Sequence, residues 1–372
     1  KVVPFSTIKW FPFRLTKTTA GIVLLALLLS CFSTSEYVQA RGLPYLESGY
    51  QLQRHLNVLE GRAGDPWQYR VLASYLVEGA LRISAALHVP HHVAAAFILF
   101  RIAQDAVIML LPYAYYRKLG LPLAYGLVGM ALLAWGISYS HYDSDLQFNT
   151  FFDIIFYLLA GLCILADRPI WIVPITLLAA LNRETSGLIP LLPILVSAFA
   201  GPKGSLRRAM PVSIIAFVTY LVVFVGLRLA YGKQALIITA GGRPGVELLR
   251  YNLFRLVTWQ QLLATLSIIP IVAILGYRKW APGLRVLFWG IVPIWFVAHA
   301  LGAVMAETRL SLVPQALVFI PGTLFALSER MPPGASPPHQ WNNQCEPRRS
   351  ALRRRETILT ECPVTSRITL GR

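Results

Sequence analysis

Charged residues are scarce in this chain. Only 14% of its 372 residues are Asp, Glu, Lys or Arg, whereas 56% are hydrophobic. A water-soluble protein normally keeps roughly a quarter to a third of its surface charged. The shortage therefore excludes an ordinary soluble globular protein and favours a chain embedded in a membrane.

Cysteine is also rare, and the motifs of common soluble enzymes are missing. The four cysteines, Cys31, Cys163, Cys345 and Cys362, lack the spacing of a zinc site. Cys31 and Cys163 lie in apolar runs, which predicts that both are small core residues. There is no HExxH, Walker loop, GxSxG or dinucleotide-binding fingerprint.

Acidic residues are half as numerous as basic ones, 17 against 34, so the net charge is +17. Such an excess would suit a nucleic-acid-binding protein. However, the Lys and Arg residues occur in short clusters between apolar runs, as in the cytoplasmic loops of membrane proteins. We therefore predict membrane lipids as partners and no nucleic acid.

Long apolar runs are what the sequence has in abundance. They predict an all-α, polytopic helical membrane protein with about ten transmembrane helices and amphipathic surface helices in its outer loops. The expected crossings are 19–38, 91–113, 121–140, 148–166, 169–182, 187–200, 210–230, 258–277, 284–303 and 309–328. The first is interpreted as a retained signal anchor. The fifth and sixth would be about 21 Å long, too short for a full crossing, and are expected to be half-length helices.

The basic residues of the short turns predict the orientation. With the N-terminus inside, alternate turns carry the basic clusters expected of cytoplasmic loops. Those clusters are Arg117 and Lys118; Arg168; Lys203, Arg207 and Arg208; and Arg278, Lys279 and Arg285. When the long outer loops are counted as well, the two sides of the membrane differ less in their number of basic residues. The orientation is therefore inferred from the alternation of the short turns. The predicted location is a bacterial inner membrane, with both termini cytoplasmic.

The chain is expected to divide at the end of the last apolar run. Residues 1–330 form the predicted transmembrane domain, with two long outer loops at 39–90 and 231–257. The first loop contains a predicted amphipathic helix at 70–87, because Arg70, Ser74, Glu78 and Arg82 repeat every four residues. The second contains "VELLRYNLFRLV", a further predicted helix. Residues 331–372 are rich in Pro and Arg and are predicted to be a basic, disordered cytoplasmic tail.

Three predicted outer turns carry charged residues, namely "HYDSD" from His141, "NRET" from Asn182 and "AETR" from Ala306. Charged groups between apolar helices cost free energy unless they are paired. The turns therefore predict a shared polar chamber at the outer face. The alternatives are a solvated turn for Asp143 and Asp145, a structural role for Arg183 and Glu184, and interface anchoring for Glu307 and Arg309. Arg101 and Asp105, four residues apart, are expected to form a structural salt bridge.

These features together resemble a known group of enzymes. A signal-anchor helix precedes an acidic outer loop that runs into "DPWQYRVLASYLVEGALR". An acidic pair follows between spans three and four, and "AALNRETSGLIPLLPIL" and "AETRLSLVPQALVFIP" follow in turn. The arrangement resembles the GT-C superfamily of polytopic membrane glycosyltransferases, especially its uncharacterised bacterial members. The likeness covers most of residues 1–328 as architecture.

The resemblance implies transfer of a hexose or pentose from a polyprenyl-phosphate-linked donor to an acceptor at the outer face. The implied catalytic residues are Asp143 and Asp145, together with Glu47 or its rival Asp65. The implied substrate-binding residues are Arg70, Arg183, Glu184, Glu307 and Arg309. A Mg²⁺ or Mn²⁺ ion held by His141, Asp143 and Asp145 is an alternative, although several members of the superfamily need no metal.

The chemistry of these residue types suits the implied reaction. A carboxylate can take the proton of an incoming hydroxyl. Arginine or a divalent metal can stabilise the phosphate that leaves. Two other functions remain open: a transporter or flippase for a lipid-linked or anionic substrate, which broken helices with charged turns also suggest, and a non-catalytic membrane subunit.

Overall fold

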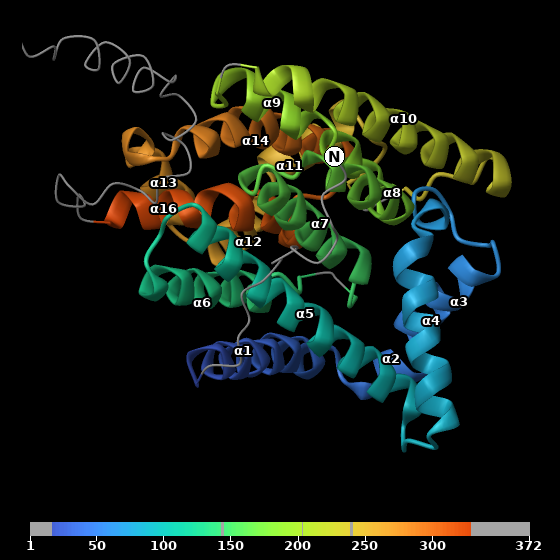
Figure 1. Ribbon diagram of the computed structural model, residues 1–372. Helices are drawn as coiled ribbons and strands as arrows, with labels where there is room; N and C mark the ends of the chain where they lie inside the picture. The colour runs from blue at the N-terminus through green and yellow to red at the C-terminus, as the bar shows by residue number, and fades with distance from the viewer. Residues whose placement is uncertain (1–16, 143–144, 203, 239–240, 329–372) are drawn as a thin grey trace, which may run out of the picture. The chain divides into compact units, whose positions relative to one another are not determined.

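Helices make up nearly all the regular structure of the chain (Figure 1). The computed structural model describes residues 17–142, 145–202, 204–238 and 241–328. Within these ranges there is no strand, and the only β-bridge joins Asp65 to Leu236. The predicted basic tail at 331–372 lies outside the described residues.

Six described helices are long and apolar enough to cross a membrane. They are α1 (Lys17–Arg41), α5 (His92–Lys118), α7 (Phe148–Leu165), α10 (Ser205–Tyr231), α14 (Pro282–Gly302) and the segment Thr308–Leu327, which includes α15 (Leu312–Pro314) and α16 (Ile320–Leu327). The last segment begins with a 3₁₀ turn and contains a π-helical turn at Gln315–Phe319.

Four other apolar helices are shorter or broken. Three of them are short. They are α6 (Leu123–Tyr139), the segment Pro169–Asn182 with α8 (Ile172–Asn182), and the segment Glu184–Phe199 with α9 (Leu191–Phe199). The predicted span 258–277 is instead a pair, α12 (Leu256–Leu266) and α13 (Ile269–Leu275), bent by 69°. Each predicted segment thus coincides with a helix or with this pair. The chain is an all-helical protein suited to a membrane, while the count of ten crossings stays a prediction.

The helix α7 lies at the centre of the described bundle, and α10 lies at its edge. Of the most apolar part of α7, 72% is buried, against 11% for α10. The helix α7 packs against α5, α8, α9 and the last apolar segment. Large apolar side chains such as Val222 and Leu229 on α10 remain exposed, as expected of a helix that faces lipid.

The contact between α1 and α5 contains a buried ion pair. Arg101 Nε donates to Asp105 Oδ2 over 3.1 Å, which confirms the predicted salt bridge. Ser33 Oγ on α1 donates to the same carboxylate over 3.0 Å. The prediction for Cys31 was wrong: this side chain is exposed on α1, because it lies on the face of the helix where large apolar side chains such as Leu28 and Phe32 also point outward. Cys163 is buried as predicted.

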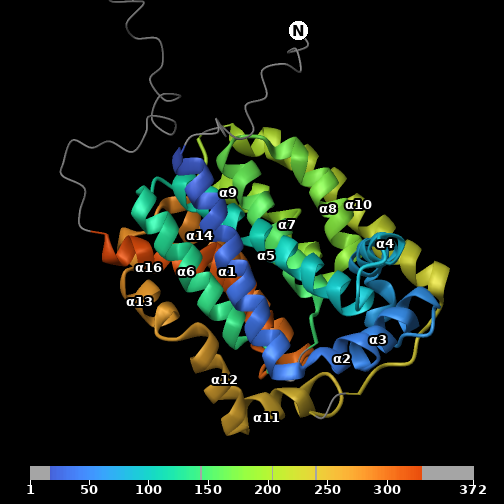
Figure 2. The ribbon, with the colours of Figure 1, turned by 90° about the horizontal axis from the view of Figure 1, so that it is seen from below.

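The first long loop folds into four helical pieces at one end of the bundle. They are α2 (Leu43–Glu47), α3 (Tyr50–Leu59), a 3₁₀ turn (Trp67–Tyr69) and α4 (Val71–Ala86). The helix α4 runs across the direction of α1 and is seen end-on in Figure 2. It confirms the helix predicted at 70–87, including the pair in which Arg82 Nε donates to Glu78 Oε1 over 2.7 Å. The second loop contains α11 (Val246–Phe254), also as predicted.

Backbone hydrogen bonds join the two long loops. Asp65 N donates to Ala235 O over 2.9 Å, and Ile237 N donates back to Asp65 O over 3.1 Å. Tyr69 Oη donates to Gly232 O over 2.8 Å. Gly64 permits this approach, because a Cβ atom there would lie 2.8 Å from the carbonyl oxygen of Ala235.

Candidate functional site

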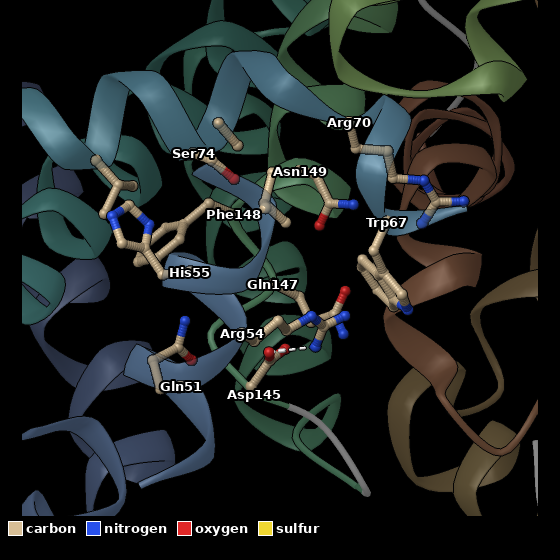
Figure 3. Close-up of a pocket in the computed structure, with 13 residues that line it drawn as sticks. Gln51, Arg54, His55, Trp67, Arg70, Ser74, Asp145, Gln147, Phe148 and Asn149 are labelled. Carbon is tan, nitrogen blue, oxygen red and sulfur yellow. Dashed lines mark hydrogen bonds and ion pairs between the residues drawn. The ribbon is translucent and has the colours of Figure 1, made fainter. Parts of the chain in front are cut away.

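A small open pocket, lined by both polar and apolar side chains, lies between α3, α4 and the start of α7 (Figure 3). Its lining includes the charged groups Arg54, Arg70 and Asp145 and the ring of Trp67. Amide and imidazole side chains complete the polar part of the wall, namely Gln51, His55, Gln147 and Asn149. Such a wall offers many hydrogen-bond donors and acceptors around one aromatic ring.

An ion pair between Arg54 and Asp145 spans the pocket (Figure 3). The Arg54 guanidinium also lies over the Trp67 ring, 3.3 Å from its centroid. Asp145 is only 4% exposed, so the alternative of a solvated position is wrong for this residue. Burial, with the nearby charge of Asp145, raises the pKa of Tyr45 to about 12, so this phenol keeps its proton at neutral pH.

Arg70 connects this pocket to the turn at 182–186. Its Nη2 and Nε atoms donate to Glu184 Oε2 over 2.9 and 3.2 Å. The turn itself is fixed by two tyrosines: Tyr157 Oη donates to Thr185 O over 2.6 Å, and Tyr220 Oη donates to Glu184 O over 3.0 Å. Two predicted residues from distant parts of the sequence, Arg70 and Glu184, are therefore in direct contact.

Arg183 forms a buried ion pair with Asp153, which is itself part of a hydrogen-bond network. Its Nη1 atom donates to Asp153 Oδ2 over 3.3 Å, and both side chains are buried. Asp153 also accepts from Asn182 Nδ2 over 2.9 Å and from Thr185 Oγ1 over 3.1 Å. Burial, with the neighbouring Arg70, lowers the pKa of Arg183 to about 10, which still leaves it charged at neutral pH.

Arg309 is buried, with 2% of its surface exposed, and it pairs with Glu307 through Nη2. This burial contradicts the alternative of interface anchoring, which would leave the guanidinium at the membrane surface. Arg309 and Arg183 do not line the pocket of Figure 3. They are nevertheless close enough to interact electrostatically, as are Arg183 and Arg70.

Trp295 on α14 joins the two arginine-bearing turns. Its Nε1 atom donates to Leu310 O over 2.6 Å, next to Arg309. Its ring meets Tyr157 edge to face at 5.3 Å, and Tyr157 bonds to Thr185 beside Arg183. Trp295 and Tyr157 therefore connect two of the three charged turns, whereas a chamber shared by all three stays a prediction.

Other predicted site residues lie elsewhere or outside the described part. Glu47 pairs with exposed His91, 2.5 Å from its Nδ1 atom, and is not in the pocket wall. Asp65 lies in the contact between the two loops. Asp143 falls outside the described residues. His141 Nδ1 bonds to Ser138 O over 2.7 Å, and no group of three metal-binding side chains occurs among the residues described. The metal site stays a prediction.

Sequence reasoning missed Arg54, Trp67 and the role of Asp153. Asp153 gave a usable signal, because an acidic residue inside an apolar span is a functional-site hypothesis by default. Trp67 lies in the quoted motif "DPWQYR" but carries no charge that would single it out. Arg54 lies on α3, a short helix that the sequence analysis did not predict.

Comparisons of the chain with models of protein families, with curated proteins and with solved structures found no match.

Proposed function

We propose that the protein is a membrane glycosyltransferase that moves a sugar from a polyprenyl-phosphate-linked donor to an acceptor at the outer face. The expected enzyme class is a hexosyl- or pentosyltransferase. The resemblance to the GT-C superfamily motivates this proposal. The arrangement of arginines and carboxylates gives it physical support.

One observation carries the proposal. Four arginines have buried nitrogen atoms without hydrogen-bond partners among the described residues; one is Arg285 near the start of α14, and the other three belong to the candidate site: Arg54 Nη2, Arg183 Nε, and Arg309 Nε and Nη1. A buried unpaired donor costs about 1–3 kcal/mol, and more when it is charged. Guanidinium groups bind phosphate through such donors, often two at a time. The open donors therefore suit a phosphate that arrives with the substrate.

The two halves of the site suggest separate tasks. Arg183 and Arg309 would bind the lipid phosphate and stabilise the charge that develops as it leaves. The pocket between α3 and α4, with its amide groups and Trp67, would bind hydroxyl groups of a sugar. Asp145 would act on the reacting sugar after release from Arg54. The ion pair between Arg70 and Glu184 would keep the two halves of the site in a fixed relative position.

The test uses the purified full chain in lipid nanodiscs with radiolabelled polyprenyl-phosphate hexose or pentose. We expect transfer to decrease about 100-fold in Arg183→Lys and Arg309→Lys, because lysine keeps the charge but lacks the two-pronged geometry. Arg82→Lys is the matched control, since Arg82 also pairs with a carboxylate but its side chain is 79% exposed. Equal turnover in all three variants would overturn the proposal.

The bent pair α12–α13 supports a second function. Broken helices near charged turns are typical of transporters for anionic substrates. The break lies at Ser267, and Thr265 just before it lies 2.5 Å, oxygen to oxygen, from Thr308 in the turn that carries Arg309. A transporter or flippase would exchange labelled lipid-linked sugar across sealed vesicles without forming a covalent product, whereas the transferase would form one.

A further inference from the structure

His55 on α3 is an imidazole in the wall of the small pocket, and the proposed function has not yet used it (Figure 3). Its Nε2 atom lies 3.0 Å from Oε2 of Glu78 on α4. Hydrogen bonds from His55 and Arg82 hold the pKa of Glu78 below its ordinary 4.5, so Glu78 is ionised at neutral pH. An ionised carboxylate only accepts hydrogen bonds, so Nε2 carries the proton. In the neutral ring, Nδ1 is then left with a lone pair.

Two neighbours fix the orientation of this ring. Glu78 holds Nε2 and is itself held by Arg82, whose Nε atom donates to Glu78 Oε1 over 2.7 Å. Phe97 on α5 meets the imidazole edge to face, with 5.9 Å between the ring centroids. Nδ1 accepts no hydrogen bond from any residue that the structure describes, and Figure 3 shows the ring projecting from α3 toward the pocket. The lone pair is therefore available to a group that enters the pocket.

A short series of contacts leads from this pocket to the proposed phosphate site. Arg70 lines the pocket together with His55. Its guanidinium donates to Glu184 Oε2 over 2.9 and 3.2 Å, and Glu184 directly follows Arg183 in the chain. A donor whose phosphate lies at Arg183 can thus turn its sugar toward the pocket, where an acceptor hydroxyl would meet both the sugar and Nδ1.

The carboxylates predicted to act on the acceptor are engaged elsewhere. Glu47 pairs with His91 outside the pocket wall, and Asp65 lies in the contact between the two long loops. Asp145 lines the pocket but forms an ion pair with Arg54, which would lose its partner if Asp145 were protonated. Protonation of His55 has the opposite effect, because the imidazolium would attract the carboxylate that already holds it.

We infer that His55, oriented by Glu78, is the general base of the proposed transfer, an inference that rests on the proposed function. The acceptor hydroxyl gives its proton to Nδ1 while its oxygen forms a bond to the anomeric carbon of the donor. The bond from that carbon to the phosphate oxygen breaks, and its electron pair stays on the lipid phosphate. The imidazolium is stabilised by Glu78 and later releases its proton to water.

The charged groups around His55 decide how a pH profile is interpreted. Among the described residues, only Glu78 forms a hydrogen bond or ion pair with the imidazole. Glu78 stays ionised above pH 4.5, because its pKa is lowered. The acid limb of the rate profile is therefore assigned to His55, and Asp145→Asn tests that assignment. The titratable and charged residues on the elements around the ring are Tyr45, Glu47, Arg54, Arg70, Glu78, Arg82, Arg101, Asp105 and Asp145.

The test uses the purified full chain in nanodiscs, with radiolabelled polyprenyl-phosphate hexose as donor and a bacterial cell-envelope extract as the source of acceptor. We expect the rate at saturating donor to decrease about 100-fold in His55→Gln and His55→Ala, with the acid limb of the pH profile lost. Added imidazole should restore part of the rate of His55→Ala, because the pocket is open. Glu78→Gln should lower the rate about 10-fold and move the acid limb toward lower pH, because an amide stabilises the imidazolium less than a carboxylate does.

His91→Gln is the matched control, because His91 also pairs with a glutamate but its side chain is 74% exposed. This variant should keep the wild-type rate and pH profile. Binding of unlabelled polyprenyl monophosphate should stay within about twofold in all variants at positions 55, 78 and 91, since the imidazole is not assigned to the phosphate.

The outcomes separate this inference from the proposed function. If His55→Gln keeps both the rate and the acid limb while Arg309→Lys abolishes transfer, the inference about His55 is wrong and the proposed function stands. The inference also fails if Asp145→Asn removes the acid limb and His55→Gln does not, or if imidazole restores nothing to folded His55→Ala. If both His55 variants unfold, Glu78→Gln decides, and an unshifted acid limb there overturns the inference. If the wild-type chain transfers no sugar, the proposed function and this inference fail together.

Discussion

The ion pair between Asp153 and Arg183 gives the sharpest prediction about stability. We expect Asp153→Asn to destabilise the protein strongly, although the side chain keeps its shape. The substitution removes the charge that faces Arg183 in a place where only 1% of Asp153 and 5% of Arg183 is exposed. Water cannot replace the lost interaction there.

The expected magnitude follows from burial and from the number of donors. Breaking a buried pair by removing one partner costs about 3–5 kcal/mol, because the other charge stays buried and uncompensated. Thr185→Ala removes only the neutral donor 3.1 Å from Asp153 and should cost about 1 kcal/mol. The double variant Asp153→Asn/Arg183→Met removes both charges, so it should be more stable than the sum of its single changes predicts.

The measurement is unfolding in mixed micelles as the fraction of SDS increases, followed by tryptophan fluorescence. The chain offers a control of matched geometry: Arg208 and Asp167 also lie 3.3 Å apart, but their side chains are 60% and 64% exposed. Asp167→Asn should change the unfolding free energy by less than about 1 kcal/mol. Equal effects at Asp153 and Asp167, or strictly additive effects in the double variant, would refute the reasoning.

Three further predictions concern packing, pH and orientation. Gly276→Ala should destabilise the protein by about 1–3 kcal/mol in the same SDS titration, because the new Cβ atom would lie 2.1 Å from Cβ of Ala326. Gly226→Ala is the control and should be tolerated, because there is open space around Gly226. Hydrogen bonds from His55 and Arg82 hold the pKa of Glu78 below its ordinary 4.5. The contribution of Glu78 to stability is therefore present above pH 4.5 and is lost as the pH falls through the lowered pKa. The stability difference between wild type and Glu78→Gln should shrink upon acidification, and a constant difference would contradict this. With the native cysteines replaced, an impermeant maleimide applied to intact cells should label Arg82→Cys but not Arg208→Cys, and the opposite pattern would invert the predicted orientation.

The sequence predicted the long helices well, because each one has its own apolar run. The segments around α5, α7, α10 and α14 are long and uninterrupted. The bend between α12 and α13 was not predicted, since "LATLSIIPIV" remains apolar through the break. The break depends on the backbone of Ser267, which has a positive φ of 53°. Hydrophobicity carries no information about such a turn.

The site was predicted less completely, for a different physical reason. Charged turns such as "NRET" stand out in an apolar sequence, and the structure joins Glu184 to Arg70. Burial of Arg309 was not predictable, because a charged residue at the end of a span also suits the membrane surface.

The joined backbones of the two long loops have a mechanical consequence. Tyr69 and Gly232 lie 163 positions apart in the chain, yet they are tied by one hydrogen bond, and residues 65, 235 and 237 are tied by two more. The two loops are therefore expected to move together at this contact, and lengthening the segment 232–237 by one residue should displace Tyr69 and with it Trp67 in the same 3₁₀ turn. An insertion far away in sequence would in this way change the shape of the pocket wall at Trp67.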